Sequence, residues 1–355
     1  MLIFLHFITN NRCLKRVALL KQKSFTLRNV SVKFVSILIA LKSNLWIWVS
    51  ILLMKWARYI TILIYLPITL IGKIIYVNNN AGDGGDGSSW IQAYRYLQDG
   101  LQASRPTDEI WVAAGTYKPD IGGKKITGDR TATFELKQQV SMYGGFNGDE
   151  TLRKDRNWKR NMTVLSGEIG DDPSLWSRHV MTSINTEWTL DGFHVIRGNA
   201  DGQDDRGYGG GLYINPLDHH RPMVRNCIFR ENRAFLGGGG IAIIQEGNNL
   251  SGHNLLLNCV FEENRSDGNG GGLFIKTGLV AKYQILNTVF ANNSARNGGG
   301  LYLDSLDGGN LINCVIAENE ATGIGGGVAS KYIDLINCTV VNNRAIVGGG
   351  LSLIN

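Results

Sequence analysis

The strongest constraint on the fold is an internal repeat in the C-terminal half of the chain. Each copy contains two asparagines, the second lying six residues after the first, and a glycine cluster follows. The first asparagines are 32, 29, 26 and 24 residues apart, and periods of roughly 20–50 residues are typical of solenoids. The copies cover Asn226–Asn232, Asn258–Asn264, Asn287–Asn293, Asn313–Asn319 and Asn337–Asn343, after a degenerate copy at Phe193–Asn199.

The composition of the repeat decides which kind of solenoid it forms. Triple glycines, β-branched residues and period-two patterns are poor helix material, so a helical solenoid is excluded. Strands this short suit a coil of two or three strands, stacked in parallel on the next coil. The predicted fold class is therefore all-β, a parallel β-helix solenoid.

Each position of the repeat has an expected role. Glycine permits positive φ at corners, and a corner asparagine can pair its amide with the asparagine of the next coil. Strand alternation predicts that the residues just before, just after and three after the first asparagine point inward. These are Leu257, Cys259 and Phe261, then Leu286, Thr288 and Phe290, then Ile312, Cys314 and Ile316. The opposite face is also apolar, and either loops or a partner could cover it; it comprises Leu256, Val260, Ile285, Val289, Leu311 and Val315.

The cysteines follow the same repeat. Four of the five come directly after the first asparagine of a copy, and Cys13 lies far upstream. The four do not show the close spacing typical of zinc sites or disulfide frameworks. We therefore predict that Cys227, Cys259, Cys314 and Cys338 pack as small buried hydrophobic side chains.

The N-terminal stretch differs from the rest in charge. Residues 1–73 hold 11 Lys and Arg and no acid, which leaves 25 basic and 30 acidic residues, a net charge of −5, for the remainder. An acidic body argues against nucleic-acid binding. Met54 to Arg58 followed by the apolar run to Gly72 has the order of a secretory signal, so we expect residues 1–53 to be a non-structural or mispredicted extension. A retained membrane anchor is the alternative for residues 54–73, and membrane contact is expected only through this segment.

Residues 74–185 predict an N-terminal β-helix module ahead of the repeats at 186–355. A strand is expected at Ile74–Val77, and an amphipathic helix from Ser89 to about Ser104. Ser89 and Gln92 fit a capping box, while Trp90, Tyr94, Leu97 and Leu101 share one face. Such a helix would cap the open end of the sheet stack. At the other end the chain stops within a repeat, so we expect the stack to be continued or covered there.

Residues 74–355 resemble two groups of bacterial surface proteins. Phe229, Phe261 and Phe290 each stand three residues before an asparagine, as in the repeats of polymorphic outer-membrane proteins, although Ile316 and Val340 replace Phe in the last two copies. The N-terminal module resembles that of pectin-lyase-like surface proteins through Asp108–Pro119, Tyr143–Phe146 and Thr163–Gly167. The resemblance implies a right-handed parallel β-helix and a secreted or outer-membrane location. It implies little about activity, because this fold hosts adhesins, structural spikes and carbohydrate-active enzymes.

The candidate chemistry lies in a loop between Asn199 and Gly209. It contains Asp201, Asp204, Asp205 and Arg206. A glycoside hydrolase needs two carboxylates about 5–10 Å apart, and a lyase of this group would use acids that bind Ca²⁺ together with an arginine. Acids in glycine-rich loops are more often turn formers. A lyase site would bind Ca²⁺, and no other cofactor is expected; His219 and His220 are predicted to be loop residues rather than metal ligands.

Two functions are compatible with the sequence. The first is a non-catalytic surface or secreted protein for adhesion, binding or structure, whose partner would be a polysaccharide or another surface protein. The alternative is a polysaccharide lyase or glycoside hydrolase. An enzyme should gather acids and bases from successive coils on one face, whereas Glu231, Glu262, Glu263 and Glu318 are predicted to lack basic partners in register. That absence favours the non-catalytic function.

Overall fold

The computed structural model describes residues 72–184, 186–215, 222–245, 255–277, 283–305 and 309–354. They belong to one compact unit, Ile71–Asn355. The predictions for residues 1–53 and 54–73 lie outside the described residues apart from Gly72 and Lys73, as do His219 and His220. Within the described ranges, no helix has both the length and the apolar character needed to cross a membrane.

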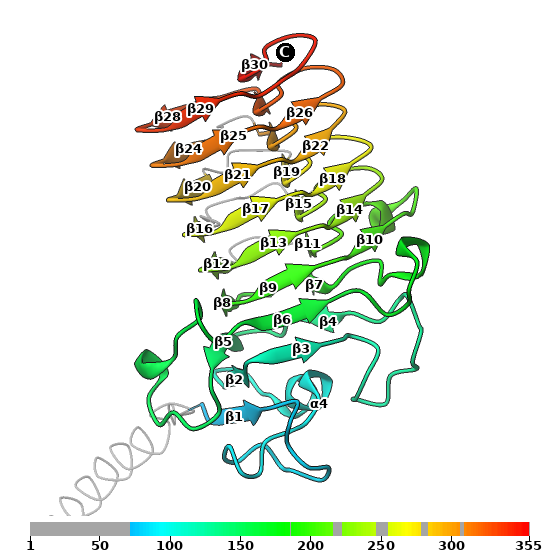
Figure 1. Ribbon diagram of the computed structural model, residues 1–355, viewed down its shortest axis with the longest axis vertical. Coiled ribbons are helices and arrows are strands. Elements are labelled where there is room, and N and C mark those ends of the chain that lie inside the picture. Colours follow the sequence, from blue (N-terminus) through cyan, green and yellow to red (C-terminus); the bar gives the residue numbers. More distant parts are fainter. Residues whose placement is uncertain are drawn as a thin grey trace, which may run out of the picture. The chain divides into compact units, whose positions relative to one another are not determined.

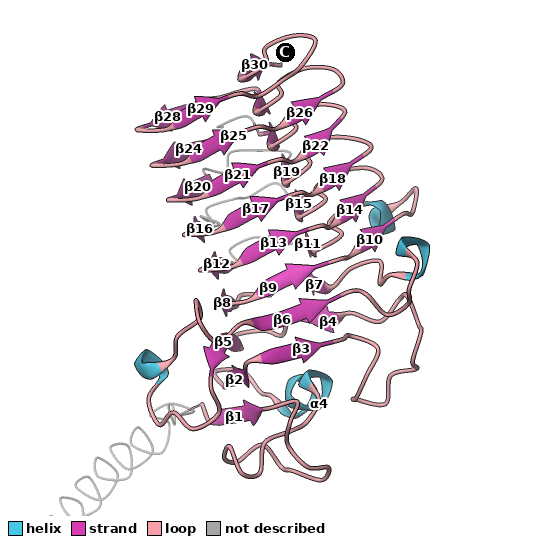
Figure 2. Ribbon diagram, viewed as in Figure 1, coloured by secondary structure: helices cyan, strands magenta, loops and turns pink. Residues whose placement is uncertain are grey.

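The described unit is a stack of coils in which every strand pairing is parallel (Figure 1). The chain passes from sheet A to sheet B to sheet C and returns to sheet A one level further along, as the strands of Figure 2 show. In the five coils from β8 to β27, a short strand of sheet D is inserted between sheets B and C. The predicted all-β fold, a parallel β-helix, is confirmed.

The four sheets contain all the strands of the described unit. Sheet A comprises β1 (Ile74–Val77), β2 (Glu109–Ala113), β5 (Ser141–Phe146), β8 (Thr189–Asp191), β12 (Met223–Arg225), β16 (Leu255–Leu257), β20 (Tyr283–Leu286), β24 (Gly309–Ile312) and β28 (Ile333–Ile336). Sheet B comprises β3 (Gly115–Tyr117), β6 (Thr163–Ser166), β9 (His194–Ile196), β13 (Ile228–Arg230), β17 (Val260–Glu262), β21 (Val289–Ala291), β25 (Val315–Ala317) and β29 (Thr339–Val341). Sheet C comprises β4 (Phe134–Glu135), β7 (Met181–Ile184), β11 (Leu212–Asn215), β15 (Ile241–Gln245), β19 (Leu273–Thr277), β23 (Leu301–Asp304), β27 (Val328–Ser330) and β30 (Leu351–Leu353). Sheet D comprises β10 (Asn199–Ala200), β14 (Arg233–Ala234), β18 (Arg265–Ser266), β22 (Ser294–Ala295) and β26 (Glu320–Ala321).

The first asparagine of each repeat forms the corner between sheets A and B. Asn258 and its equivalents adopt the left-handed conformation, with φ between 50° and 55°, which asparagine tolerates better than most residues. Their exposed amides form a ladder: Asn258 Nδ2 donates to Asn226 Oδ1 at 3.2 Å, and Asn287 Nδ2 to Asn258 Oδ1 at 3.1 Å. The predicted amide pairing between coils is confirmed at this corner.

The left-handed corner also changes which residues face the core. The residues after each corner point inward as predicted, and Cys259 and Phe261 are buried. The residues just before it do not: the prediction was wrong for Leu257, Leu286 and Ile312, which are only half-buried. The left-handed residue breaks strand alternation, so the inward residues lie two positions before the corner. These are Leu256, Ile285 and Leu311, exposed by 4%, 1% and 0%.

The second asparagine of each repeat forms another ladder, inside the protein. Asn264 is fully buried, and its Nδ2 donates to Phe229 O at 2.8 Å and to Asn293 Oδ1 at 3.0 Å. Its Oδ1 accepts hydrogen bonds from the Asn232 backbone N–H at 3.2 Å and from Asn232 Nδ2 at 3.0 Å. Asn293 and Asn319 repeat the pattern. These amides satisfy backbone groups that the turn would otherwise bury unpaired.

Stacked side chains of one kind fill the space between the ladders. Phe229, Phe261 and Phe290 lie face to face, with ring centroids 5.2 Å and 4.8 Å apart. Cys227, Cys259 and Cys314 are buried free thiols and Cys338 is half-buried. The prediction that the repeat cysteines pack as hydrophobic side chains is confirmed for the three that are buried.

A buried carboxylate ends the outer asparagine ladder. Asp191, the last residue of β8, is 1% exposed, and its Oδ2 pairs with Arg156 at 2.7 Å and Arg225 at 2.6 Å. Its Oδ1 accepts from Asn226 Nδ2 at 2.8 Å. Arg156 also lies over the ring of Tyr143, in the neighbouring strand β5. This network joins the strands of residues 74–185 to the first full repeat.

A short helix, α4 (Leu97–Ala103), packs against the first strands of the stack. Leu97 and Leu101 belong to the core, and the end near Ser104 agrees with the prediction. The predicted start at Ser89 is wrong, because the segment before Leu97 turns back on β1: Tyr94 N–H donates to Tyr76 O at 2.9 Å. Ser89 Oγ still accepts from Gln92 N–H at 3.2 Å, so half of the expected capping box stabilises a turn instead.

Candidate functional site

The loop that contains the sequence-predicted site connects β10 to β11 and forms a single turn of 3₁₀ helix, η4 (Asp205–Gly207). Asp204 is the N-cap of this turn, and its side chain accepts a hydrogen bond from Arg206 N–H at 3.1 Å. The same carboxylate binds the Arg206 guanidinium through both oxygens, at 2.6 to 3.0 Å. Asp205, the first residue of the turn, is exposed. Three of the four predicted residues therefore lie together in one exposed turn.

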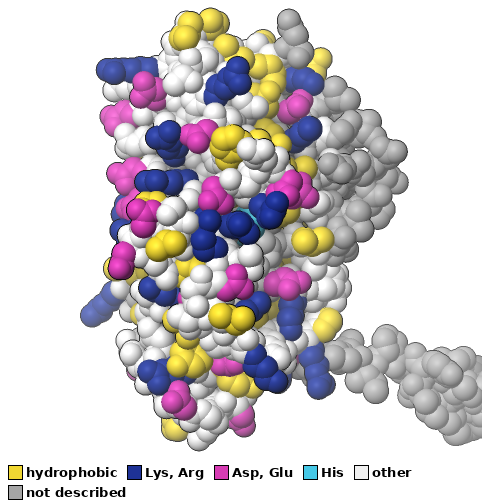
Figure 3. Space-filling view, turned by 90° about the vertical axis from the view of Figure 1, so that its right-hand side faces the viewer, with side chains coloured by type: hydrophobic (Ala, Val, Ile, Leu, Met, Phe, Trp, Pro, Cys, Tyr) yellow, Lys and Arg dark blue, Asp and Glu magenta, His cyan; other side chains and the backbone are white. Residues whose placement is uncertain are grey.

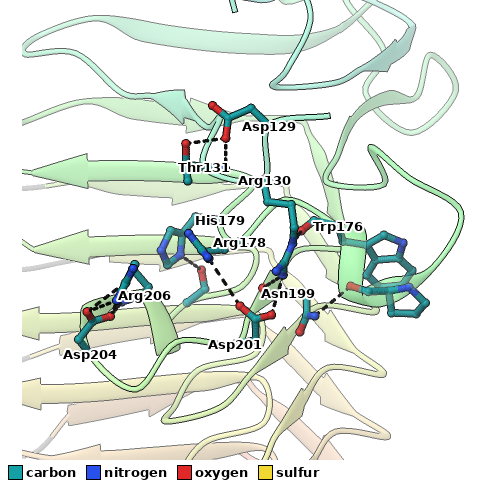
Figure 4. Close-up of polar contacts among 12 residues, drawn as sticks. Asp129, Arg130, Thr131, Trp176, Arg178, His179, Asn199, Asp201, Asp204 and Arg206 are labelled. Carbon is teal, nitrogen blue, oxygen red and sulfur yellow. Dashed lines mark hydrogen bonds and ion pairs between the residues drawn. The ribbon is translucent and has the colours of Figure 1, made fainter. Parts of the chain in front are cut away.

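The fourth residue, Asp201, lies between two arginines from earlier coils. Its Oδ2 is 2.8 Å from Arg130 NH2, and its Oδ1 is 3.6 Å from Arg178 Nε. Figure 4 shows Asp201 reaching both guanidinium groups while Asp204 is turned toward Arg206. Arg130 precedes β4 and Arg178 precedes β7, so the three residues occupy the same corner in three successive coils.

The backbone around these arginines is tied into the same corner. Arg130 Nε donates to Trp176 O at 2.8 Å, and Arg178 N–H donates to Arg130 O at 2.9 Å. Next to Arg178, His179 uses Nδ1 to bond with Gly209 O at 3.1 Å. Since a carbonyl only accepts hydrogen bonds, Nδ1 carries the proton in this contact. Burial lowers the pKa of His179, which keeps the ring neutral near pH 7.

The electrostatics around Asp204 oppose a role for it as a general acid. The hydrogen bonds from Arg206 lower the pKa of Asp204 to about 2, so this carboxylate stays ionised and paired. A general acid requires the opposite shift, toward neutral pH. Asp201 has a cation on either side of it. Among the described residues, no group of three or more His, Cys, Asp or Glu side chains is placed to hold a metal ion.

Reasoning from the sequence missed Arg130, Arg178 and His179. They lie outside the repeats, in a part of the chain where strands are irregularly spaced, so their register with Asp201 could not be derived. The pairing of β4, β7 and β11 supplies that register.

The prediction that the acids of the repeats lack basic partners is wrong for two of them. Arg230 and Glu262 are neighbours in register on β13 and β17, and their side chains pair at 2.5 Å. Glu231 binds Arg197 at 2.8 Å, and Arg197 also pairs with Glu168. Glu231, Glu263 and Glu318 occupy a second left-handed corner, with φ of 56° or 57°. The acids thus belong to corners and surface ion pairs that span coils.

Acidic and basic side chains also lie close together on the surface over these corners. Figure 3 views the side that carries sheet D, and basic and acidic side chains alternate over it with apolar side chains between them. An aliphatic stripe also flanks the outer asparagine ladder on the other corner: Val260 and Val289 are half-buried, and Val315 is 38% exposed. The sequence-predicted apolar outer face is therefore narrower than expected, because Leu256, Ile285 and Leu311 belong to the core.

Comparison with known proteins addresses the fold. The profile of the family described as a right-handed β-helix region matches residues 210–355. The fold is a right-handed parallel β-helix. Among solved structures, this β-helix is similar to pectate lyase Pel9A, with a TM-score of 0.44 and 14% identity over 80% of this chain and 78% of that one. It is also similar to a rhamnogalacturonan lyase, with a TM-score of 0.35 and 12% identity over 75% of this chain and 85% of that one. A search of curated proteins finds no match. At these identities the lyases carry no argument about activity.

Proposed function

We propose that this right-handed β-helix is a non-catalytic module of the cell envelope or the extracellular space, which binds a polysaccharide. The observation that supports this most directly is the state of the candidate carboxylates. Asp204 is held by both of its oxygens, and Asp201 faces two arginines. The lowered pKa of Asp204 keeps this carboxylate ionised near neutral pH, so Asp204 is unsuited to be the protonated acid that glycoside hydrolysis needs.

The surface chemistry supports a binding role. Long ladders of identical side chains fix the coils in register, and the ion pairs between coils hold the outer side chains in place. A rigid surface binds an extended polymer with little loss of conformational entropy. The ladder itself thus contributes preorganisation to binding.

One observation favours the alternative, a polysaccharide lyase or glycoside hydrolase. Arg130, Arg178 and Asp201 converge from three successive coils, as an active site on one face of a β-helix would require. An arginine pair could bind a uronate carboxylate. Asp201 already pairs with Arg130 at 2.8 Å and lies 3.6 Å from Arg178 Nε, however, which makes this function second to the non-catalytic one.

The test is a turnover assay on the full-length protein. Homogalacturonan and neutral glucans are incubated with and without Ca²⁺, and both reducing ends and the ultraviolet absorbance of unsaturated products are followed. We expect no turnover, together with retention of the protein on at least one insoluble polysaccharide. Turnover that disappears in Asp201→Asn or in an Asp204→Asn, Asp205→Asn double variant would refute the proposal and place catalysis in this loop.

The proposed location has its own test. Producing cells are fractionated, and intact cells are treated with an impermeant amine-reactive label. We expect the protein in the envelope or the medium and expect labelling of its exposed lysines. Recovery of the whole population in the cytoplasm would contradict this part of the proposal.

A further inference from the structure

A second surface feature lies at the N-terminal end of the helix, away from the arginine cluster. It is a cleft of about 610 Å³ between the loop after β1, the segment before α4, and α4 itself. The residues that matter for its chemistry are Asp83, Tyr94, Arg95, Tyr96, Asp99 and Gln102. We call this feature the N-terminal cleft; α4 and β1 mark its position in Figure 1. The volume of the cleft lies within the range of roughly 300–1,000 Å³ that is typical of pockets for small ligands.

Tyr94 is held in place from both sides. Its N–H donates to Tyr76 O at 2.9 Å, and its carbonyl accepts from Asn78 N–H at 2.8 Å. Gly87 packs against the ring, because a Cβ there would lie 2.5 Å from Cε2 of Tyr94. The positive φ of Gly87, 73°, also favours glycine. This wall of the cleft is therefore formed before any ligand arrives.

Tyr96 and Asp99 are fixed by a second glycine turn. A Cβ on Gly122 would come within 2.3 Å of Tyr96 Cβ, so only glycine allows this close approach. Asp99 Oδ1 accepts from Gly123 N–H at 2.8 Å, which ties the turn to the first turn of α4. Both side chains are half-buried. An aromatic ring and a carboxylate thus stand together on a rigid base.

The charges of the cleft select among ligand classes. Asp83 and Asp99 are acids and Arg95 is the one base among the lining residues, which gives a net charge of −1. Arg95 already pairs with Asp83 at 3.1 Å and lies over the Tyr96 ring at 5.7 Å from its centroid. Anions such as uronates and phosphates are therefore repelled, and a cation would compete with Arg95 for Tyr96.

We propose that the N-terminal cleft binds a neutral saccharide. Aromatic faces and edges suit the C–H faces of a pyranose ring, while carboxylate, guanidinium and carboxamide groups can exchange hydrogen bonds with vicinal hydroxyls. Gln102 contributes the carboxamide one turn after Asp99. This inference rests on the proposed binding function and specifies its ligand class, since the acidic cleft disfavours polyuronates.

The experiment measures binding by isothermal titration to the full-length protein in a detergent without a sugar headgroup. The probes are cellohexaose, laminarihexaose, mannohexaose and N-acetylchitohexaose, with trigalacturonate as the charged comparison. We expect at least one neutral probe to bind and trigalacturonate to bind at least tenfold more weakly. Tyr96→Ala should weaken binding at least tenfold, and Tyr96→Phe by less than about threefold, because the ring is retained.

Two further variants keep the test decisive. An Asp83→Asn, Gln102→Ala double variant removes only exposed polar groups and should weaken binding even if Tyr96→Ala fails to fold. Tyr332→Ala removes a tyrosine that is 59% exposed near the other end of the helix and should leave binding unchanged. If no neutral probe binds, or if trigalacturonate binds more tightly, the inference is wrong. If saccharide binding is unchanged in the Tyr96→Ala variant and in the Asp83→Asn, Gln102→Ala double variant, the saccharide binds elsewhere. The assignment to the N-terminal cleft would then be wrong, while the proposed binding function would stand.

Discussion

The inner asparagine ladder gives the sharpest prediction about stability. Asn264→Ala removes four hydrogen bonds, two donated by Nδ2 and two accepted by Oδ1. At about 1 kcal/mol for each bond, the expected loss is about 4 kcal/mol. The Asn232 backbone N–H loses its carboxamide acceptor in a fully buried position, so relaxation cannot bring in water to replace it.

The outer ladder of the same coil supplies a matched control. Asn258 makes two side-chain bonds along its ladder, and its amide is exposed, so water can replace them. Asn258→Ala should cost about 1–2 kcal/mol, mostly because φ is 54° and alanine resists the left-handed conformation. Asn258→Gly removes that strain and should be nearly neutral.

The assay is urea unfolding of the full-length protein, followed by far-ultraviolet circular dichroism. The free energies of unfolding are compared among variants that share one denaturant slope, which is required for a two-state comparison. If Asn264→Ala and Asn258→Ala differ by less than about 1 kcal/mol, the buried amides do not carry the stability assigned to them.

Two further predictions concern the thiols and the buried carboxylate. Burial raises the pKa of Cys259 to about 12, above the ordinary thiol value of 9.0, so the folded chain keeps a proton that the unfolded chain releases. The stability this provides is complete below pH 9 and is lost as the pH rises toward 12, by about 1.4 kcal/mol per pH unit. In urea unfolding at pH 8 to 11, the free energy of unfolding should therefore decline less steeply with pH in Cys259→Ala than in the unmodified protein. An equally steep decline in both proteins would contradict the assignment. Asp191→Asn leaves Arg156 and Arg225 without their counter-charge, and we expect a loss of about 3 kcal/mol in urea unfolding. A loss no larger than that of an exposed pair, about 0–1 kcal/mol as for Asp267→Asn, would show that water reaches this network.

Much of the fold could be predicted from the sequence because the repeat has one physical solution. Glycine clusters, paired asparagines and short apolar stretches recur together, and only a stack of parallel coils uses all three in every copy. The error at Leu257 came from applying strand alternation through Asn258, whose left-handed φ could not be derived from the pattern. The early start assigned to the helix came from a capping pair, Ser89 and Gln92, that stabilises a turn just as well.

The candidate site was less predictable, for a reason that lies in the register. Asp201 and its neighbours were visible as a cluster along the chain, whereas Arg130 and Arg178 meet Asp201 only through the pairing of β4, β7 and β11. Ion pairs between coils, such as Arg230 with Glu262, require the same information. The sequence therefore shows where the acidic residues are, whereas the pairing of the coils determines which of them have a basic partner.

From β12 to the end of the stack, variation in coil length is concentrated at a single corner. In these coils the strands of sheets A, B and D and the glycine turns recur with nearly constant spacing, while the connection from sheet C back to sheet A shortens from β15 on. It covers 246–254 after β15, 278–282 after β19, 305–308 after β23 and 331–332 after β27. Insertions and deletions at this corner leave both asparagine ladders and the phenylalanine stack in register. The molecule thus separates a part that must repeat from a part that is free to diversify, and new specificities can arise along one edge without a cost to the rest.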